Sequence, residues 1–375
     1  MKIIIDDKIP YIRGAFERVA DVVYLPGSKT TPEIVKDADA IVTRTRTSCN
    51  EKLLTGSKVK FIATATIGYD HIDTDYCKKA GIVWTNAPGC NSKSVEQYIA
   101  STIIVLAERR NLRLKDLCIG VVGVGNVGSK VANICHILGM KVLLNDPPRE
   151  REEGSTEFVS LHQVMQEADI ITLHVPLNLQ GEDATFHLGN EHFLSSLKRK
   201  PVLINSCRGE VIETNAVKMA LKTGLLSGFV CDCWENEPDI DLELLDMTEL
   251  ATPHIAGYSK DGKATGTRMS VQAISEYFGL GLDSWQPTGI EPPTQPIIEL
   301  DGEGLNEQEL ISKAILSTYD IRHDDMQFRK DTTLFEQLRG DYPVRREFSA
   351  FTIQAYNSGN EVLEKLKKIG FKIKE

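Results

Sequence analysis

The first 90 residues alternate short apolar runs with mixed segments. Five of the apolar runs predict buried strands, at residues 3–6, 22–24, 40–43, 61–63 and 83–85. Helical patterns lie between several of these runs, and alternation of strand and helix is typical of parallel βαβ units. This part of the chain therefore predicts an α/β domain.

A second set of apolar runs begins near residue 118. It predicts strands at residues 118–122, 141–145, 170–174, 202–205 and 228–232. Each run ends in a short polar or glycine-containing loop, and doubly wound α/β folds bind ligands at the carboxyl ends of their strands. Two long helical patterns, at 94–110 and 262–279, are placed to connect this set with the first.

The pattern changes after residue 283, where prolines and glycines cluster up to residue 304. A helix at 307–320, a polar stretch, a strand at 349–355, a helix at 361–369 and a strand at 371–374 follow. We therefore expect three domains. They comprise residues 1–93 with 260–284, residues 94–259, and residues 285–375.

Charge and composition narrow the possible partners. The formal net charge is −10, whereas a protein that binds a phosphate backbone needs a basic face. No apolar run is long enough for a signal peptide or a membrane span. We expect a cytoplasmic protein without nucleic-acid or membrane partners.

The eight cysteines are scattered, and several fall inside apolar patterns. Cys231 and Cys233 have a single residue between them, a spacing that forms neither a C-x-x-C redox pair nor a zinc knuckle. We expect reduced cysteines and no metal.

The strongest motif is a glycine pattern after the strand at 118–122. Gly123, Gly125 and Gly128 have the spacing G-x-G-x-x-G, and Asp146 ends the next strand eighteen positions after Gly128. Glycines permit the tight turn and the close approach of a pyrophosphate to a helix N-terminus. A carboxylate at position 146 accepts hydrogen bonds from ribose hydroxyls and repels a 2′-phosphate. The motif predicts binding of NAD rather than NADP.

Three polar groups follow predicted strands of the second set: Arg208, Glu237 and His254. Oxidation of a 2-hydroxy acid needs a proton acceptor, a cation for the carboxylate and a group that tunes the acceptor. Histidine, arginine and glutamate can supply these roles. A single histidine or arginine of this kind is more often a solvated loop residue, but the ordered set behind a glycine motif favours catalysis.

The segments HVP, NSCRGEVI, WENEP and HIAGY resemble those of the D-isomer-specific 2-hydroxy-acid dehydrogenases over about the first 280 residues. The resemblance implies a Rossmann NAD-binding domain and a flavodoxin-like substrate domain. It also implies that His254 is the acid/base, Glu237 its paired carboxylate and Arg208 the carboxylate-binding cation. The cofactor contacts that it implies are Gly123, Gly125, Asn126, Val127, Gly128, Asp146, Val175, Ser206, Cys207, Arg208, Asp232 and Gly257.

Further segments, among them KFIATATIGYDHID and HIAGYSKDGKATGT, resemble a branch of this family that serves vitamin B6 synthesis. This narrower resemblance implies 4-phospho-D-erythronate as substrate, with contacts from Thr45, Thr66 and Tyr258. Arg44 and Arg46 follow a predicted strand and are candidates for binding the phosphate. Two positions depart from the expected pattern, because Thr45 replaces a serine and Val175 a threonine.

The region after residue 285 resembles a small α+β dimerisation domain of the same branch, through YDIRHDD and YPVRREFSAFT. We expect a homodimer in which Arg345 and Arg346 reach the phosphate site of the partner, or else solvate a surface turn. Two alternatives remain open. One is a dehydrogenase for another phosphorylated acid such as 3-phosphoglycerate, and the other is an NAD-sensing binding protein of the corepressor type.

Overall fold

The structure is a computed structural model that describes residues 1–374, and its chain divides into two compact units. Unit 1 comprises residues 1–91 and 259–291, and unit 2 comprises residues 92–258 and 292–375. We expected boundaries after residues 93, 259 and 284, whereas the boundaries between the two units follow residues 91, 258 and 291; the division into three domains stays a prediction. The expected third domain, whose last residue lies outside the described part, is grouped with the NAD-binding domain in unit 2.

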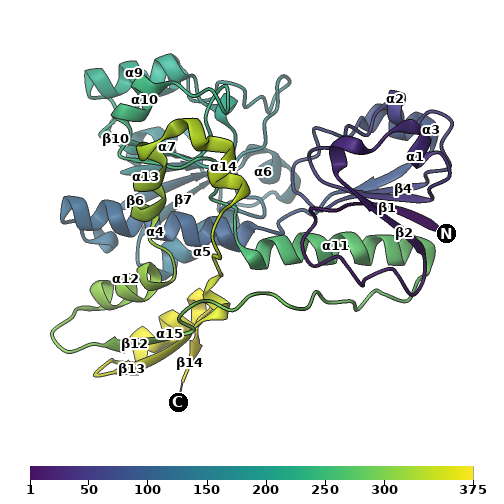
Figure 1. The fold of residues 1–375 in the computed structure, drawn as a ribbon. Helices are drawn as coiled ribbons and strands as arrows, with labels where there is room; N and C mark the ends of the chain where they lie inside the picture. The colour runs from purple at the N-terminus through teal and green to yellow at the C-terminus, as the bar shows by residue number, and fades with distance from the viewer. Residues whose placement is uncertain (375) are drawn as a thin grey trace. The chain divides into compact units, whose positions relative to one another are not determined.

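Unit 1 is built on a parallel five-stranded sheet in the order β2-β1-β3-β4-β5, which is the flavodoxin-like order (Figure 1). Its strands are β1 (Lys2–Asp6), β2 (Asp21–Leu25), β3 (Ala40–Thr43), β4 (Phe61–Thr64) and β5 (Val83–Thr85). Its helices are α1 (Pro32–Val35), α2 (Glu51–Leu54), α3 (Thr74–Ala80) and α11 (Lys260–Phe278). Ile3 and Ile5 pack with α11 on one face, whereas Ile4 packs with α2 on the other.

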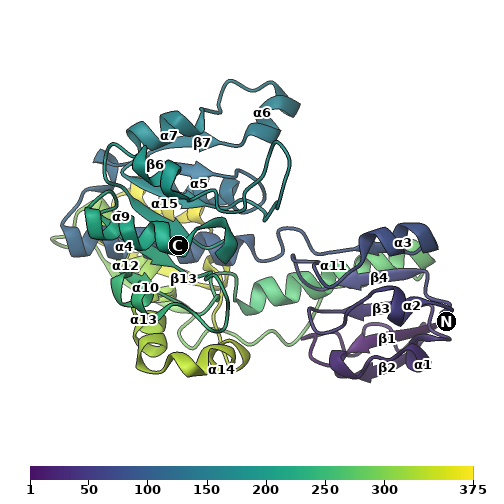
Figure 2. The same cartoon turned by 90° about the horizontal axis from the view of Figure 1, so that it is seen from above.

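Unit 2 contains a parallel six-stranded sheet in the order β11-β10-β9-β8-β6-β7, seen from above in Figure 2. Its strands are β6 (Cys118–Val122), β7 (Lys141–Asn145), β8 (Ile170–Leu173), β9 (Val202–Asn205), β10 (Gly228–Cys231) and β11 (Leu250–Ala251). The strand order reverses between β6 and β8, which is where doubly wound folds bind dinucleotides. Leu144 and Phe158 form a single parallel bridge beside β7, where a Rossmann sheet usually has a further strand.

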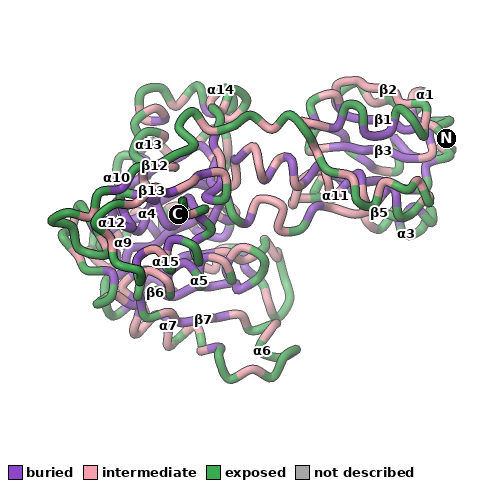
Figure 3. The backbone as a smooth tube through the Cα atoms, turned by 90° about the horizontal axis from the view of Figure 1, so that it is seen from below, coloured by how far each residue is buried: buried purple, intermediate pink, exposed green. Residues whose placement is uncertain are grey.

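Helices cover both faces of this sheet, and its strands are buried along most of their length (Figure 3). Apolar side chains of α4 (Ser92–Arg110) and α5 (Gly128–Ile137) pack on one face. The opposite face is covered by α7 (Leu161–Glu167), α8 (Glu191–Ser195), α9 (Thr214–Thr223) and α10 (Leu242–Met247). The exposed helix α6 (Pro147–Glu153) follows β7.

The C-terminal region adds a three-stranded sheet of β12 (Ile297–Asp301), β13 (Thr352–Tyr356) and β14 (Lys372–Ile373). Its strands are parallel, with α12 (Glu307–Thr318) and α15 (Asn360–Ile369) among the connecting elements. Residues of both helices share one apolar cluster with α4 and α5. The region therefore completes the core of the NAD-binding fold.

Two features of this region differ from expectation. The polar stretch after residue 320 forms two helices, α13 (Ile321–Lys330) and α14 (Phe335–Gly340). The apolar pattern of α13 is weak because buried Asp325, which pairs with half-buried Arg329 at 2.8 Å, occupies part of its packed face. Strand β12 lies in the segment taken for a linker, and its buried residues alternate with exposed Glu299 and Asp301.

Among residues 1–374, no helix is both long enough and apolar enough to cross a membrane.

Candidate active site

The glycine loop connects β6 to α5. Gly123 has φ +84°, and a Cβ atom there would lie 2.7 Å from the carbonyl carbon of His174. A Cβ atom at Gly128 would lie 1.9 Å from the oxygen of Gly123. Both positions therefore require glycine, and α5 begins at Gly128 without a side-chain cap, so its first N–H groups can face an anion.

Two further observations fit NAD. The space around the Cβ position of Gly125 is open to 4 Å, which allows a ligand to approach the backbone. The Ser206 hydroxyl, after β9, is buried without a hydrogen-bond partner. A buried hydroxyl that lacks a partner is uncommon in a folded protein and indicates a ligand. The residues present therefore fit a bound dinucleotide.

Asp146 lies at the end of β7, as expected. Its Oδ2 accepts a hydrogen bond from the N–H of Val124 at 2.7 Å, so the carboxylate is fixed beside the glycine loop. The neighbouring cation Arg149 contacts both carboxylate oxygens of Glu153, at 2.6 and 3.0 Å. Because that ion pair occupies Arg149, the site has a fixed carboxylate and a neutralised cation, an arrangement that disfavours a 2′-phosphate.

The remaining residues expected to contact the cofactor follow the strands of the same sheet. Val175 lies just beyond β8 and is half-buried, and Gly257 lies on the loop after β11. Burial raises the pKa of the Cys207 thiol to about 11, and its sulfur donates to Asn205 Oδ1 at 3.1 Å. Cys207 is therefore a neutral thiol at physiological pH. Asn126 and Val127 belong to the glycine loop, where Asn126 is exposed.

His254 and Glu237 form the expected pair. His254 Nδ1 lies 2.8 Å from Glu237 Oε2, and the other carboxylate oxygen accepts a hydrogen bond from the N–H of Trp234 at 2.8 Å. This contact directs Nε2, the outer ring nitrogen, away from the pair. An imidazole held by a carboxylate at one nitrogen can exchange a proton at the other.

Asp232 positions the loop that carries His254. Its carboxylate accepts hydrogen bonds from the Thr252 hydroxyl at 2.6 Å and from the N–H groups of Ile255 and Ala256 at 2.7 and 3.0 Å. Burial raises the pKa of Asp232, while the charge of His254 and these hydrogen bonds act in the opposite direction. Through these three hydrogen bonds, the carboxylate of Asp232 holds the loop that carries His254.

Arg208 lies on the loop after β9, in the same unit as His254. Its Nη1 donates to the carbonyl of Cys207 at 2.8 Å, and the side chain is partly exposed. The next residue must be glycine because a Cβ atom at Gly209 would lie 2.0 Å from the oxygen of Trp234. This close approach joins the Arg208 loop to the loop that bears Glu237.

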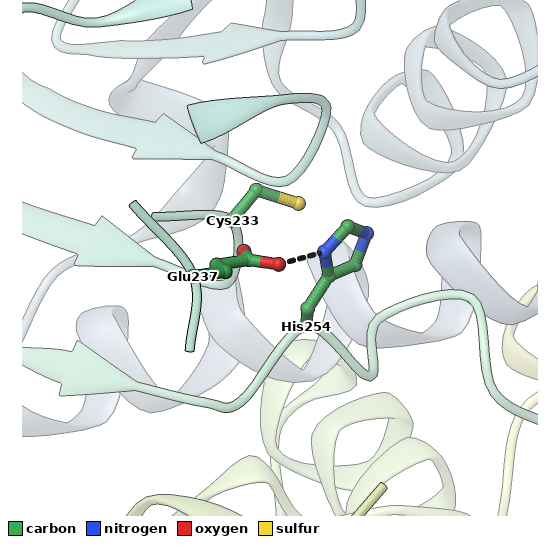
Figure 4. Close-up of side chains that lie close together, drawn as sticks. All are labelled: Cys233, Glu237 and His254. Atoms are coloured by element: carbon green, nitrogen blue, oxygen red, sulfur yellow. Dashed lines mark hydrogen bonds and ion pairs between the residues drawn. The ribbon is translucent and has the colours of Figure 1, made fainter. Parts of the chain in front are cut away.

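The structure places a third side chain, Cys233, beside the His254–Glu237 pair, which the sequence did not indicate. The sulfur of Cys233, a carboxylate oxygen of Glu237 and a ring nitrogen of His254 all lie within 4.8 Å of one another (Figure 4). Burial raises the pKa of the Cys233 thiol well above its ordinary value, so the thiol keeps its proton. The spacing of Cys231 and Cys233 in the sequence gave no sign that Cys233, which follows the end of β10, would lie beside His254.

The residues expected to bind substrate in unit 1 surround the end of β3. Thr45 and Arg46 are exposed, and Arg44 Nε lies 3.6 Å from the buried Oδ2 of Asp6. Thr66 follows β4, and its hydroxyl donates to the carbonyl of Gly68 at 2.9 Å.

Lys263 was missed, although it belongs to the quoted segment SKDGK. Burial, followed by the charges of Lys260 and Arg44, lowers its pKa. Because the charge of Arg44 affects Lys263, Lys263 is a further cation near Arg44 in unit 1.

The structure contradicts the expected role of Arg345. Its guanidinium is buried within its own chain, donates to Ser94 O at 2.5 Å and to Gln97 Oε1 at 2.8 Å, and stacks 3.8 Å from the Tyr319 ring centroid. Arg345 therefore neither reaches a partner nor solvates a turn. Arg346 is partly exposed, and its carbonyl accepts a hydrogen bond from Gln97 at 3.0 Å.

Family models match two parts of the chain. The model described as "D-isomer specific 2-hydroxyacid dehydrogenase, NAD binding domain" matches residues 93–256. A domain of unknown function, DUF3410, matches residues 292–370.

Two curated relatives cover almost the whole chain. Erythronate-4-phosphate dehydrogenase of Bacteroides fragilis (strain YCH46) is 54% identical over 354 residues, 94% of this chain and 99% of the relative. The protein of the same name from Klebsiella pneumoniae (strain 342) is 40% identical over 374 residues, 99% of this chain and 98% of the relative.

Solved structures share the fold. D-lactate dehydrogenase from Aquifex aeolicus, complexed with NAD and lactic acid, has a TM-score of 0.61 and 28% identity and covers 76% of this chain and 97% of its own. NAD-dependent formate dehydrogenase from Staphylococcus aureus, with a TM-score of 0.59 and 21% identity, covers 74% and 96% and shows a likeness of fold alone.

The fold, the glycine loop and the family match define an NAD-dependent oxidoreductase of the D-isomer-specific 2-hydroxyacid dehydrogenase class. Within that class, the chain belongs to the erythronate-4-phosphate dehydrogenase family.

Proposed function

We propose that this enzyme oxidises 4-phospho-D-erythronate to the corresponding 2-oxo acid, a step in the synthesis of pyridoxine phosphate. The observation that carries the proposal is the 54% identity to a relative of that name, which extends through the C-terminal region. The 3-phosphoglycerate and corepressor alternatives have less support, because the relatives named above match over nearly the full chain.

The residues of unit 2 have separable roles in this reaction. NAD, held at the glycine loop, would supply the acceptor for the hydride that leaves C2. His254 Nε2 takes the proton of the C2 hydroxyl, and the C2 carbonyl forms as both leave. Glu237 stabilises the imidazolium through the 2.8 Å contact with Nδ1. Arg208 binds the C1 carboxylate, and fixing it beside the proton acceptor lowers the entropic part of the barrier.

The phosphate needs cations of its own. Arg44, Arg46 and Lys263 in unit 1 are the candidates, with Thr45 and Thr66 as hydroxyl donors. Tyr258 in unit 2 is a further substrate contact. Arg44 also lies 3.6 Å from the buried carboxylate of Asp6, which partly neutralises its charge.

We further propose that the protein is a cytoplasmic homodimer that associates through the C-terminal region. Apolar side chains exposed there support an interface, since Ile297 and Tyr356 are 50% and 47% exposed. Light scattering of the full chain should give twice the mass of the monomer, and a monomer at working concentration would refute this part.

The substrate is tested by following NADH formation with 4-phospho-D-erythronate, 3-phosphoglycerate and D-erythronate. We expect kcat/KM to be highest for 4-phospho-D-erythronate. A higher value for 3-phosphoglycerate would replace the proposed substrate, and no turnover of any acid, with NAD still bound, would favour the corepressor alternative.

A further inference from the structure

One arginine of the C-terminal region lies beside the catalytic loop without being part of any motif described above. Arg339, on α14, has its guanidinium carbon 6.0 Å from the ring centroid of Tyr258 and 5.7 Å from that of Phe335. These distances are within the range at which a cation interacts with an aromatic face. Tyr258 is four residues beyond His254, so this contact brings the C-terminal region to the active-site loop.

The donors of Arg339 are only partly used. Nη1 donates to Glu336 Oε1 at 3.1 Å, whereas Nε is buried and has no hydrogen-bond partner. A buried N–H without an acceptor is unfavourable, and such groups are uncommon unless a water, an ion or a ligand completes them. Burial lowers the pKa of Arg339, but the charges of Tyr258, Glu336 and Glu237 and a side-chain hydrogen bond with Tyr258 more than offset it. The guanidinium therefore stays charged, and it interacts electrostatically with the carboxylate of Glu237.

The position of Arg339 is fixed by aromatic packing. Phe335, at the start of α14, is 1% exposed and packs edge-on against Phe328 at 5.7 Å. Phe328 in turn packs against Trp234 at 6.1 Å, and the N–H of Trp234 holds Glu237. This chain of contacts couples α14 to the loop that carries Glu237.

We propose that Arg339 binds the phosphate of the substrate together with Tyr258, and that the C-terminal region thereby contributes to substrate specificity from within the same chain. The inference rests on the proposed function. A guanidinium with an unused, buried donor suits a phosphate oxygen, since charge-assisted contacts of arginine with phosphate are strong. Arg339 would then take the role that the sequence suggested for Arg345, whose donors are committed to the protein interior.

The test compares the full-length enzyme with Arg339→Met and Arg339→Lys, using NAD and 4-phospho-D-erythronate. Loss of one charge-assisted hydrogen bond should raise KM in Arg339→Met by about ten- to a hundredfold, with kcat changed less. Inorganic phosphate should compete with substrate, and its inhibition constant should rise in parallel. Arg339→Lys keeps the positive charge but lacks the planar guanidinium, so its KM should lie between those of the wild type and Arg339→Met.

Arg322→Met is the matched control, because Arg322 is an exposed arginine on the neighbouring helix α13, paired with Asp320 at 2.6 Å. It should leave KM and phosphate inhibition unchanged. Unchanged KM and phosphate inhibition in folded Arg339→Met would overturn the inference. A KM rise without any change in phosphate inhibition would also overturn it, because Arg339 would then act on the structure or the carboxylate.

The two proposals can fail separately. If the wild-type enzyme does not oxidise 4-phospho-D-erythronate, the proposed function is wrong whatever Arg339 does. If the wild type oxidises it and Arg339→Met behaves like the wild type, the inference alone is wrong.

Discussion

Unit 2 contains two histidine–glutamate pairs whose local geometry is almost the same. His254 lies 2.8 Å from Glu237, and His187 lies 2.7 Å from Glu235. The two histidine side chains are 30% and 31% exposed, with backbone φ angles of +55° and +51°. A short histidine–carboxylate contact therefore does not by itself identify a catalytic pair.

The two pairs differ in which ring nitrogen is used. His254 meets its carboxylate through Nδ1, which leaves the outer nitrogen for a substrate, whereas His187 uses Nε2 and leaves the nitrogen next to its own backbone. The His187 ring also stacks on Phe186 at 4.0 Å, and Glu235 accepts a hydrogen bond from the N–H of Thr214 at the start of α9. The first pair leaves a ring nitrogen available for proton exchange, whereas the second joins three segments of the fold.

The largest effect is expected at His254. His254→Asn removes the proton acceptor and should lower kcat by about a hundred- to ten-thousandfold. NAD affinity, measured by calorimetry, should change little, because the dinucleotide rests on the glycine loop. Near-normal turnover in this variant would remove His254 from the mechanism.

The next largest effect is expected at Asp146, on the preference for NAD over NADP. Asp146→Ala removes the carboxylate that favours a free 2′-hydroxyl and should narrow the preference for NAD over NADP by about ten- to a hundredfold. Titration of both dinucleotides into the apoenzyme measures this ratio. An unchanged ratio would mean that Asp146 does not select the cofactor.

A smaller effect on rate is expected at Glu237. In Glu237→Gln the carboxylate that stabilises the positive charge on the His254 ring during proton transfer becomes a neutral amide. The kcat for NADH formation should fall about tenfold because a hydrogen bond to a charged group is lost. A kcat equal to that of the wild type would contradict the pairing.

The smallest effect is expected at the His187–Glu235 pair, where a substitution should change the free energy of unfolding. Burial raises the pKa of Glu235, but hydrogen bonds from Thr214 and His187 outweigh it and leave the pKa below 4.5. A lowered pKa stabilises the fold above 4.5, and this stabilisation is lost as the pH falls through the folded value. Glu235→Gln should cost about 1 kcal/mol at neutral pH.

Denaturant unfolding of Glu235→Gln at several pH values checks this expectation. The difference from the wild type should narrow in acid. A difference that is constant with pH would show that the charge of Glu235 does not stabilise the fold.

Much of this fold follows from local patterns. The inner strands of the five- and six-stranded sheets are short apolar runs buried on both faces, which are legible in the sequence, and the glycine spacing specifies the cofactor loop. The C-terminal region was harder to predict because its signals depend on tertiary contacts. Helix α13 packs through Ile321 and Phe328 together with the Asp325–Arg329 ion pair, and β12 has acidic residues on its open face.

In the candidate site, too, some residues could be predicted from local sequence patterns and others depend on tertiary contacts. Arg208, Glu237 and His254 stand in recognisable segments, so their place in unit 2 could be expected. The burial of Arg345 could not, because it depends on carbonyls of Ser94, Ile255 and Ala256 that only the fold brings together. Arg339 likewise has no motif, and its position is set by packing between Phe335 and Tyr258.

The comparison of the two pairs is tested most directly by matched glycine variants. Both histidines have positive φ, so His254→Gly and His187→Gly each remove an imidazole without backbone strain. We predict that single-turnover NADH formation from 4-phospho-D-erythronate is lost in His254→Gly, partly restored by added imidazole, and within a few-fold of wild type in His187→Gly. Equal losses in the two variants, or wild-type turnover in His254→Gly, would contradict the assignment of the reaction to the His254–Glu237 pair.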